Sequence, residues 1–240
     1  MNDATELKWA RDLFLNTLKA YKNEFTQDFR FAIINSVFTV DNYVLPLIGC
    51  FSFNGDLLSQ WRAYADDGKG FSIGFSSNLI QQGLGVNIQP ISYDLKEQKE
   101  IIIDSLKELF IVWKENKKLF LNISKGFSID LNYLKNPHFK EEAEVRIVRL
   151  IVKDQDSLKY HDVGGNSEIN KIQPLSILER ERNGQKIKFI KLPITIPNHQ
   201  IIKEIILGPK STLDYDKVKK LLEYNNFKNV KIKKSQIPYR

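Results

Sequence analysis

Three charged residues at alternate positions are the first candidates for chemistry in this chain. The segment Phe139-Lys140-Glu141-Glu142-Ala143-Glu144-Val145-Arg146-Ile147 contains them. If a strand begins at Glu142, the side chains of Glu142, Glu144 and Arg146 point to one face, because side chains alternate along a strand. One carboxylate could then stabilise an oxocarbenium-like centre, and the other could orient or deprotonate an acceptor. The arginine would fix their charge state. A solvent-facing strand with two glutamates beside an arginine has the same pattern.

A second candidate is the segment 57–75, which combines large aromatic residues, a guanidinium and glycines. Trp61, Arg62 and Tyr64 fall on one short helix, which Asp56 can cap. An aromatic face of Trp61 or Tyr64 could stack on a base or a nicotinamide ring, and Arg62 could pair with a phosphate. The two aromatic residues are three apart, which is also the spacing of the buried face of a helix. The spacing alone favours that structural interpretation.

The elements that must position these residues follow from hydrophobic periodicity and capping signals. Asp3 and Asp94, each three residues before a Glu, have capping-box spacing. Helices are expected over residues 7–21, 27–37, 95–113 and 213–224, and strands over residues 43–53, 70–75, 86–93, 144–152, 186–192, 201–207 and 230–233. Pro46 indicates a bulge or an edge position in the first strand.

The order of these elements favours an α+β fold with a mainly antiparallel sheet and flanking helices. Strands stand before, between and after helices without the strict alternation of a parallel βαβ arrangement. The length of 240 residues fits one domain, and we expect a single domain over residues 1–240. The loop 154–174, with two adjacent glycines, is a candidate for a mobile lid.

Composition excludes several classes of protein. The one cysteine, Cys50, rules out an internal disulfide and a Cys-based zinc site, and its apolar surroundings predict a small buried side chain. His138, His161 and His199 are too dispersed to specify a metal centre, so no metal is expected. No signal peptide and no run of about 18 apolar residues is present. We therefore expect a cytoplasmic protein without a membrane partner.

The positive charge is concentrated near the C-terminus. Residues 201–240 hold nine Lys and one Arg against four acids, a difference of +6, whereas the other 200 residues hold 26 basic against 25 acidic residues. This basic segment, with Tyr215, Tyr224, Phe227 and Tyr239 interleaved, could bind nucleic acid without any catalysis. A lysine-rich, solvated helix and strand would have the same composition.

Motifs in the same order resemble a widespread bacterial family known as domain of unknown function 2971. The most specific piece is Trp61-Arg62-x-Tyr64 followed by Gly70-Phe71-x-Ile73-Gly74-Phe75. The weaker pieces are, in chain order, Asn2-Asp3-x-x-Glu6, Cys50-Phe51-Ser52, Lys135 with Phe139-x-x-Glu142-x-Glu144-x-Arg146-Ile147, Ile206-Leu207-Gly208-Pro209 and Ser235-x-Ile237-Pro238-Tyr239-Arg240. The resemblance is spread over the whole chain, but the family name implies no activity.

A more distant resemblance is to ADP-ribosyltransferases. It is carried by a Glu-x-Glu pair that enters a late strand after an aromatic, serine-bearing middle region. The resemblance implies that NAD is the substrate, that Glu144 is the catalytic carboxylate on the nicotinamide ribose, and that Glu142 acts on the acceptor side. Tyr64 or Trp61 would stack on the nicotinamide. The implied NAD-binding residues are Ser52, Trp61, Arg62, Tyr64 and Arg146.

This resemblance also implies a biological role. It indicates a fold similar to ADP-ribosyltransferases, glycosyl transfer if the chain is active, and a toxin or an effector of anti-phage defence. The acceptor would be a nucleic acid or a protein, and a toxin would have an antitoxin partner. Relatives carry a His-Tyr-Thr-like strand before the Asn-Asp-x-x-Glu segment, so we expect this chain to lack an N-terminal strand. A phosphodiester or glycosidic hydrolase that uses the same glutamates without NAD is a third alternative.

Overall fold

The structure is a computed structural model that describes residues 4–166, 171–182, 184–194, 196 and 199–239. The chain forms two compact units, and it passes between them several times. Unit 1 consists of residues 1–50, 89–163 and 176–189, and unit 2 of residues 51–88, 164–175 and 190–240. Each unit has its own sheet and its own buried side chains.

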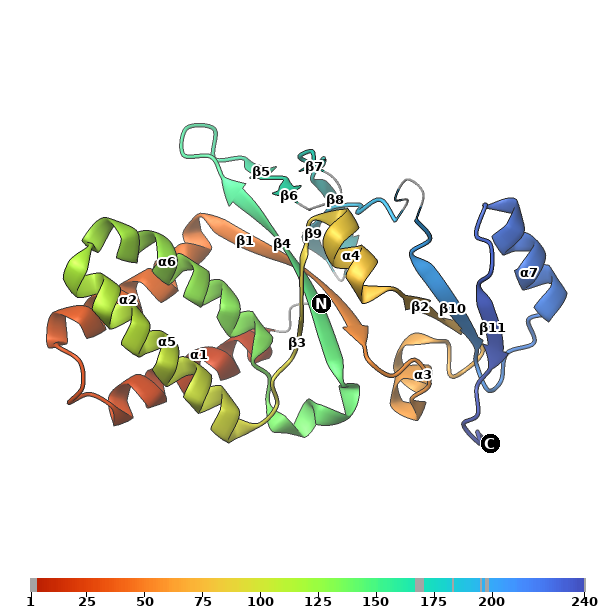
Figure 1. The fold of residues 1–240 in the computed structure, drawn as a ribbon, viewed down its shortest axis with the longest axis horizontal. Coiled ribbons are helices and arrows are strands. Elements are labelled where there is room, and N and C mark those ends of the chain that lie inside the picture. The colour runs from red at the N-terminus through yellow and green to blue at the C-terminus, as the bar shows by residue number, and fades with distance from the viewer. Residues whose placement is uncertain (1–3, 167–170, 183, 195, 197–198, 240) are drawn as a thin grey trace. The chain divides into compact units, whose positions relative to one another are not determined.

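Four helices form the larger part of unit 1 (Figure 1). They are α1 (Ala4–Ala20), α2 (Gln27–Thr39), α5 (Leu95–Glu115) and α6 (Lys117–Asp130), joined by the 3-10 turns η1 (Val40–Asn42), η2 (Leu131–Tyr133) and η3 (Pro137–Glu142). Fully buried Phe14, Phe29, Phe120 and Leu106 pack between them. The first turn of α5 is closed by Asp94, whose carboxylate accepts from the backbone N–H groups of residues 96 and 97.

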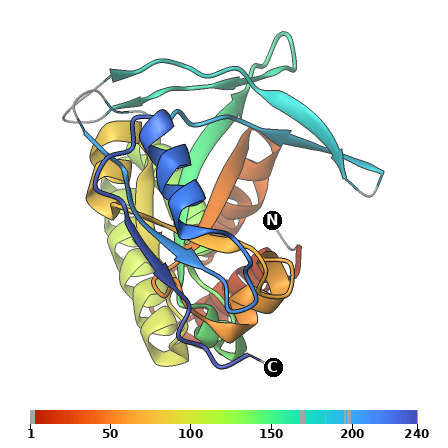
Figure 2. The same cartoon turned by 90° about the vertical axis from the view of Figure 1, so that its right-hand side faces the viewer.

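The sheet of unit 1 has the order β1-β4-β3, with β5 paired antiparallel to β4. These strands are β1 (Val44–Ser52), β3 (Asn87–Pro90), β4 (Glu144–Lys153) and β5 (Tyr160–Asp162), and the ends of β1 and β3 continue into unit 2. β4 is the central strand and is buried over most of its length. β1 stands at the end of the order, as Pro46 predicts. Figure 2 shows β8 (Leu178–Arg182) and β9 (Gln185–Phe189) as a separate antiparallel ribbon.

Unit 2 is built on a three-stranded sheet of order β11-β10-β2. Its elements are α3 (Leu58–Tyr64), β2 (Phe71–Phe75), α4 (Ser77–Leu84), β6 (Gly165–Asn166), β7 (Lys171–Ile172), β10 (Ile202–Leu207), α7 (Tyr215–Tyr224) and β11 (Lys231–Lys234). β10 pairs antiparallel with β2 but parallel with β11, because α7 lies between the two strands in sequence and returns the chain in the same direction. Both views place α7 beside β11 (Figures 1 and 2).

The predicted α+β class, with antiparallel sheets and flanking helices, is confirmed, and the β10–β11 pair is a parallel exception. Two helices, α4 and α6, were not predicted. Both begin at a polar cap that the sequence contains: Ser76 accepts from the backbone N–H of residue 79, and Asn116 from that of residue 119. The strand expected over residues 86–93 is limited to β3. The similarity of the whole fold to ADP-ribosyltransferases stays a prediction.

Three local predictions are corrected by the structure. Glu142 ends η3 and Ala143 adopts a left-handed conformation with φ of 43°, so β4 begins at Glu144 and Glu142 is not part of the strand. Asp56 does not cap α3, whose N-cap is Leu57 without a side-chain hydrogen bond. Cys50 is exposed rather than buried, because it lies on an edge strand.

Two other predictions fall partly or wholly on undescribed residues. The capping residue Asp3 lies outside the described part of the chain, and so do residues 167–170 of the expected lid. Within the described residues, none of the helices is both long enough and apolar enough to span a membrane.

Candidate functional site

The backbone at the start of β4 fixes the position of Glu144. Its N–H donates to the hydroxyl oxygen of Tyr93 at 3.1 Å, and its carbonyl oxygen accepts from the N–H of Ile91 at 3.0 Å. Just before it, Ala143 turns the chain sharply out of η3. Glu144 is only 4% exposed as a result. The sequence therefore brings a carboxylate to a nearly enclosed position at the first residue of the central strand.

The Glu144 carboxylate belongs to a cluster of four charged side chains, which we call the Glu144 cluster. Lys135 donates through Nζ to Oε2 of Glu142 at 2.6 Å and to Oε2 of Glu144 at 2.8 Å. Arg146 donates through Nε to Oε1 of Glu144 at 2.6 Å, and through Nη1 to the carbonyl oxygen of Asn132 at 2.6 Å. The two carboxylates therefore face one ammonium, and the arginine anchors the cluster to η2.

These contacts keep Glu144 ionised. Burial alone opposes the charge and would raise its pKa, but hydrogen bonds from Arg146, Cys50 and Lys135 outweigh that effect and lower the pKa to about 2. A buried charge is tolerated only when it is paired and hydrogen-bonded. At neutral pH this position therefore holds a permanent negative charge between two cations.

Cys50 lies beside the same carboxylate on β1. Although the residue reaches solvent, desolvation of its thiol and the neighbouring Glu144 carboxylate raise its pKa to about 11. The thiol therefore stays protonated at neutral pH and acts as a hydrogen-bond donor to Glu144. Because the thiolate is the nucleophilic form, this environment does not activate Cys50 for covalent catalysis.

In unit 2, the predicted stacking residue Trp61 is enclosed. It is 2% exposed, and its indole N–H donates to Oδ1 of Asp56 at 2.7 Å. The same carboxylate accepts from the hydroxyl of Ser235 at 2.5 Å and from the backbone N–H of Gln236 at 2.9 Å. Asp56 therefore joins the start of α3 to the C-terminal segment, and Trp61 belongs to this structural contact.

The other two aromatic and cationic residues of α3 lie at the surface of unit 2. Tyr64 is 69% exposed. The guanidinium of Arg62 lies 5.4 Å from the ring centroid of Tyr239, whose hydroxyl donates to Asp67. Lys210 also donates to Asp67, at 2.8 Å, and its ammonium lies 4.0 Å from the same ring. The ring of Tyr64 is thus the accessible aromatic face of α3.

The predicted site residues fall into two groups. Glu142, Glu144 and Arg146 are brought together in unit 1, whereas Ser52, Trp61, Arg62 and Tyr64 belong to unit 2. The prediction that both groups line one NAD site stays a prediction.

Sequence reasoning missed two partners of Glu144. Lys135 bridges the two glutamates, and Tyr93 holds the backbone of Glu144. A signal for Lys135 was present, because it opens the motif that contains both glutamates. Tyr93 gave no signal, since it is 51 residues away in the chain and contacts Glu144 only in the folded protein.

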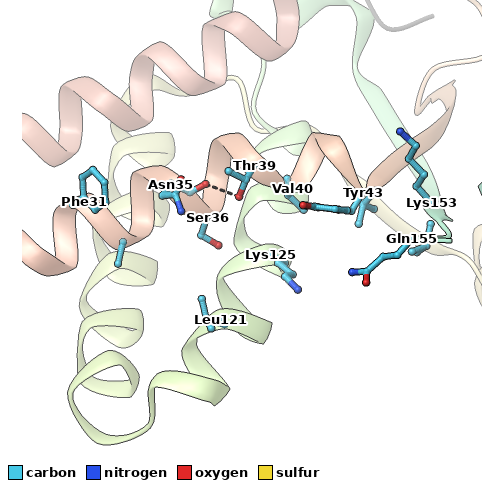
Figure 3. A pocket seen from close by; sticks show the side chains of 13 residues that line it. Phe31, Asn35, Ser36, Thr39, Val40, Tyr43, Leu121, Lys125, Lys153 and Gln155 are labelled. Atoms are coloured by element: carbon cyan, nitrogen blue, oxygen red, sulfur yellow. Dashed lines mark hydrogen bonds between the residues drawn. The ribbon is translucent and has the colours of Figure 1, made fainter. Parts of the chain in front are cut away.

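Two pockets in unit 1 lie outside the Glu144 cluster. One of about 550 Å³ is lined by α2, η1, α6 and the end of β4, with Phe31 and Leu121 on its apolar wall and Lys125 and Lys153 as its cations (Figure 3). The other, of about 680 Å³, is lined by the start of α5, by η2 and by the residues after β3. Neither has any of the predicted site residues in its lining. Within the described residues, no group of three or more His, Cys, Asp or Glu side chains could hold a metal ion.

Comparison with known proteins gives one match. No curated protein and no solved structure is detectably similar to this chain. A family model described as protein of unknown function (DUF2971) matches residues 60–147. The match contains both the Trp61-Arg62-x-Tyr64 motif and the Glu142-x-Glu144-x-Arg146 motif. Over this segment the chain is therefore similar to the family of unknown function that its motifs indicate.

Proposed function

We propose that this protein is an ADP-ribosyltransferase-like enzyme that breaks the bond between nicotinamide and ribose in NAD. The bond cleaved is the C–N glycosidic bond: nicotinamide leaves with the bonding electrons, and the ribose carbon forms a new bond to an acceptor. A carboxylate that is ionised at the reacting carbon stabilises the positive charge of this oxocarbenium-like transition state. Glu144 has that role in this proposal.

The observation that supports the proposal most strongly is the enforced charge of Glu144. Its pKa of about 2 means that no proton has to be removed before it can stabilise a cation. Its N–H and C=O groups are both bonded, so the carboxylate is held in one place. A charge that is fixed in advance in a water-poor position is the arrangement that favours electrostatic catalysis. Lys135 and Arg146 position this carboxylate.

Glu142 connects the cluster to the surface. Its side chain is 28% exposed, compared with 5% for Lys135 and 5% for Glu144. Because it shares the Lys135 ammonium with Glu144, an acceptor that meets Glu142 is close to the reacting centre. In the proposed reaction Glu142 accepts the proton of the acceptor group as the new glycosidic bond forms. Tyr64 supplies the ring that stacks on nicotinamide, and Arg62 the cation for the phosphates.

The two glutamates can be distinguished by experiment. We expect Glu144→Gln to abolish both nicotinamide release and ADP-ribose transfer, and Glu142→Gln to reduce transfer about 100-fold while nicotinamide release by hydrolysis continues. Both reactions can be followed with NAD labelled in the adenosine half, by measuring free nicotinamide and labelled acceptor separately. Equal loss of transfer and release in Glu142→Gln would contradict its role on the acceptor side.

Loss of stability has to be separated from loss of chemistry. Asp162→Asn is a matched control, because Asp162 forms a buried pair with Arg149 of β4 at 2.6 Å and both side chains are at most 3% exposed. This variant breaks a buried ion pair of the same strand without touching the Glu144 cluster. We expect similar melting temperatures for the two variants but nicotinamide release by Asp162→Asn alone.

The proposal extends to a biological role as a toxin or an effector of anti-phage defence, with an antitoxin as partner in the first case. Depletion of NAD or modification of an essential acceptor would arrest growth. Expression of the wild-type chain should then slow growth, and expression of Glu144→Gln should not. Equal effects of the two chains at equal abundance would contradict this role.

A second candidate function is binding of nucleic acid by unit 2. Six lysines of α7, β11 and the turn between them are exposed and have no ion-pair partner in the described part of the chain: Lys217, Lys219, Lys220, Lys228, Lys231 and Lys234. Tyr224, at the end of α7, is 86% exposed and could stack on a base. Phosphates of a nucleic acid would complement this surface.

The salt dependence of binding tests this candidate. We expect the affinity for a single-stranded oligonucleotide to fall with increasing salt, because neutralised phosphates release counterions. Replacement of both Lys219 and Lys220 by Gln should flatten the slope of log K against log salt by about one unit. Lys233 is a control, since it already pairs with Glu204 at 3.0 Å. Binding that does not change with salt would exclude this function.

A further inference from the structure

The pocket of about 680 Å³ in unit 1 has the size and lining of a small-molecule site. It lies between the first turns of α5, the turn η2 and the chain after β3. Its walls are largely apolar, with buried side chains from each of these elements: Ile91, Ile102, Phe127, Leu131 and Leu134. A few polar groups stand among them, and these decide what the pocket can bind.

The first of these groups is the hydroxyl of Tyr133. The residue is 5% exposed, and its oxygen has no hydrogen-bond partner within the described part of the chain. A buried hydroxyl without a partner is unfavourable, and nearly all such groups in folded proteins are satisfied by protein, water or ligand. Four other side chains have an unpartnered buried atom: Arg11, Thr17, Arg30 and Arg149. Of the five, Tyr133 is the one that lines either of the two pockets described.

The second group is the carboxylate of Asp130, which lies one turn before Tyr133 and lines the same pocket. It has neither an ion-pair nor a hydrogen-bond partner among the described residues. The other two acids of the pocket are already engaged: Asp94 caps α5, and Glu97 accepts from the hydroxyl of Ser92 at 2.8 Å. Desolvation raises the pKa of Asp130, and the nearby Asp130 charge contributes to the raised pKa of Tyr133.

The charge of the pocket selects the kind of ligand. Three carboxylates line it, from Asp94, Glu97 and Asp130, against one ammonium, from Lys140. An anion would meet repulsion, whereas a cation would be attracted. A ligand with at least two N–H groups could donate one to Asp130 and one to the oxygen of Tyr133, and an apolar body would cover the isoleucine and leucine side chains.

We propose that this pocket binds a small organic cation with an apolar or aromatic body and an amine or amidine group, which donates hydrogen bonds to Asp130 and Tyr133. The proposal does not rest on the chemistry at Glu144, because none of the residues of the Glu144 cluster lines this pocket.

The test compares benzamidine with benzoate, which has nearly the same size and shape but the opposite charge. Isothermal titration of the full chain should show benzamidine binding, with benzoate at least tenfold weaker. Tyr133→Phe removes only the hydroxyl, so we expect about tenfold weaker benzamidine binding, the equivalent of one hydrogen bond. Because the hydroxyl has no partner in the free protein, the melting temperature of Tyr133→Phe should not fall.

Charge removal completes the test. Asp130→Asn should weaken benzamidine at least tenfold, while Asp104→Asn, which removes an exposed charge of α5 outside the pocket, should change the affinity less than twofold. No binding of benzamidine to the wild type, equal binding of benzoate, or unchanged affinity in both Tyr133→Phe and Asp130→Asn would each overturn the proposal. Since NAD is absent from these titrations, their outcome is independent of whether the chain cleaves NAD.

Discussion

At the scale of single residues, Glu144 is the centre of the account. It is a buried carboxylate with two cationic partners, and such clusters cost desolvation energy that hydrophobic side chains of similar size would not. Arg149 and Asp162 form another buried pair on the same strand, but that pair is closed upon itself. The Glu144 cluster differs because its fourth member, Glu142, reaches solvent.

The low pKa of Glu144 predicts how stability depends on pH. A folded-state pKa of about 2, below the ordinary 4.5, means that the ionised form stabilises the fold above about pH 4.5. That stabilisation is lost as the pH falls towards 2, because the folded state then takes up a proton that the unfolded state has already bound. We expect Glu144→Gln to lower the free energy of unfolding by about 3 kcal/mol at pH 6.

Urea unfolding of the wild type and Glu144→Gln, at pH 6 and at pH 3, measures this difference directly. Other carboxylates contribute equally to both proteins, so their effects cancel. The difference between the two free energies of unfolding should shrink at pH 3. A difference that stays constant with pH would show that Glu144 is not ionised in the folded protein.

Residue types could be predicted from the sequence better than their arrangement. The alternation of Glu142, Glu144 and Arg146 correctly indicated charged residues that act together, and the last two do share a face of β4. Glu142 joins them from η3 instead, because the left-handed Ala143 ends the strand pattern one residue earlier. Nothing in the local pattern predicts a left-handed alanine, since that conformation is unfavourable for any residue with a Cβ.

At the scale of elements, unit 2 explains why motifs at both ends of the family-like region occur in one chain. Asp56 and Trp61 at α3 bond to Ser235 and Gln236 after β11. The turn after α3 also meets the turn after β10: the N–H of Gly208 donates to the carbonyl of Gly70 at 2.9 Å. The Gly-Pro and Ser-x-Ile-Pro-Tyr segments are therefore partners of the Trp-Arg-x-Tyr helix.

The close approach of these turns gives a prediction for Gly208→Ala. A Cβ at Gly208 would lie 2.2 Å from the carbonyl oxygen of Gly68, and backbone atoms cannot move away cheaply. We expect this substitution to destabilise the protein by about 3 kcal/mol. Gly126→Ala is the matched control: it lies inside α6 with nothing within 4 Å of the added methyl, and should stabilise by about 1 kcal/mol.

Thermal unfolding of the two alanine variants distinguishes a steric requirement from a general intolerance to substitution. The account requires opposite shifts of the melting temperature. A Gly208→Ala protein as stable as the wild type would mean that the two turns are not packed as closely as the structure has them.

At the scale of the whole molecule, periodicity predicted the class and most elements, because amphipathic helices and buried strands carry their signals locally. It did not predict the division into two units, since three separate stretches of chain make up each of them. It did not reveal the pocket at Tyr133 either. Asp130 and Tyr133 are unremarkable in the sequence and become notable only when the fold leaves both without partners.

The most direct test of the central claim is release of nicotinamide from NAD by the purified chain. The wild type and Asp162→Asn should both release it, and Glu144→Gln should be at least 100-fold slower while still folded by circular dichroism. Equal rates for the wild type and Glu144→Gln, or no release by the folded wild type, would contradict the assignment of Glu144 as the carboxylate of NAD cleavage.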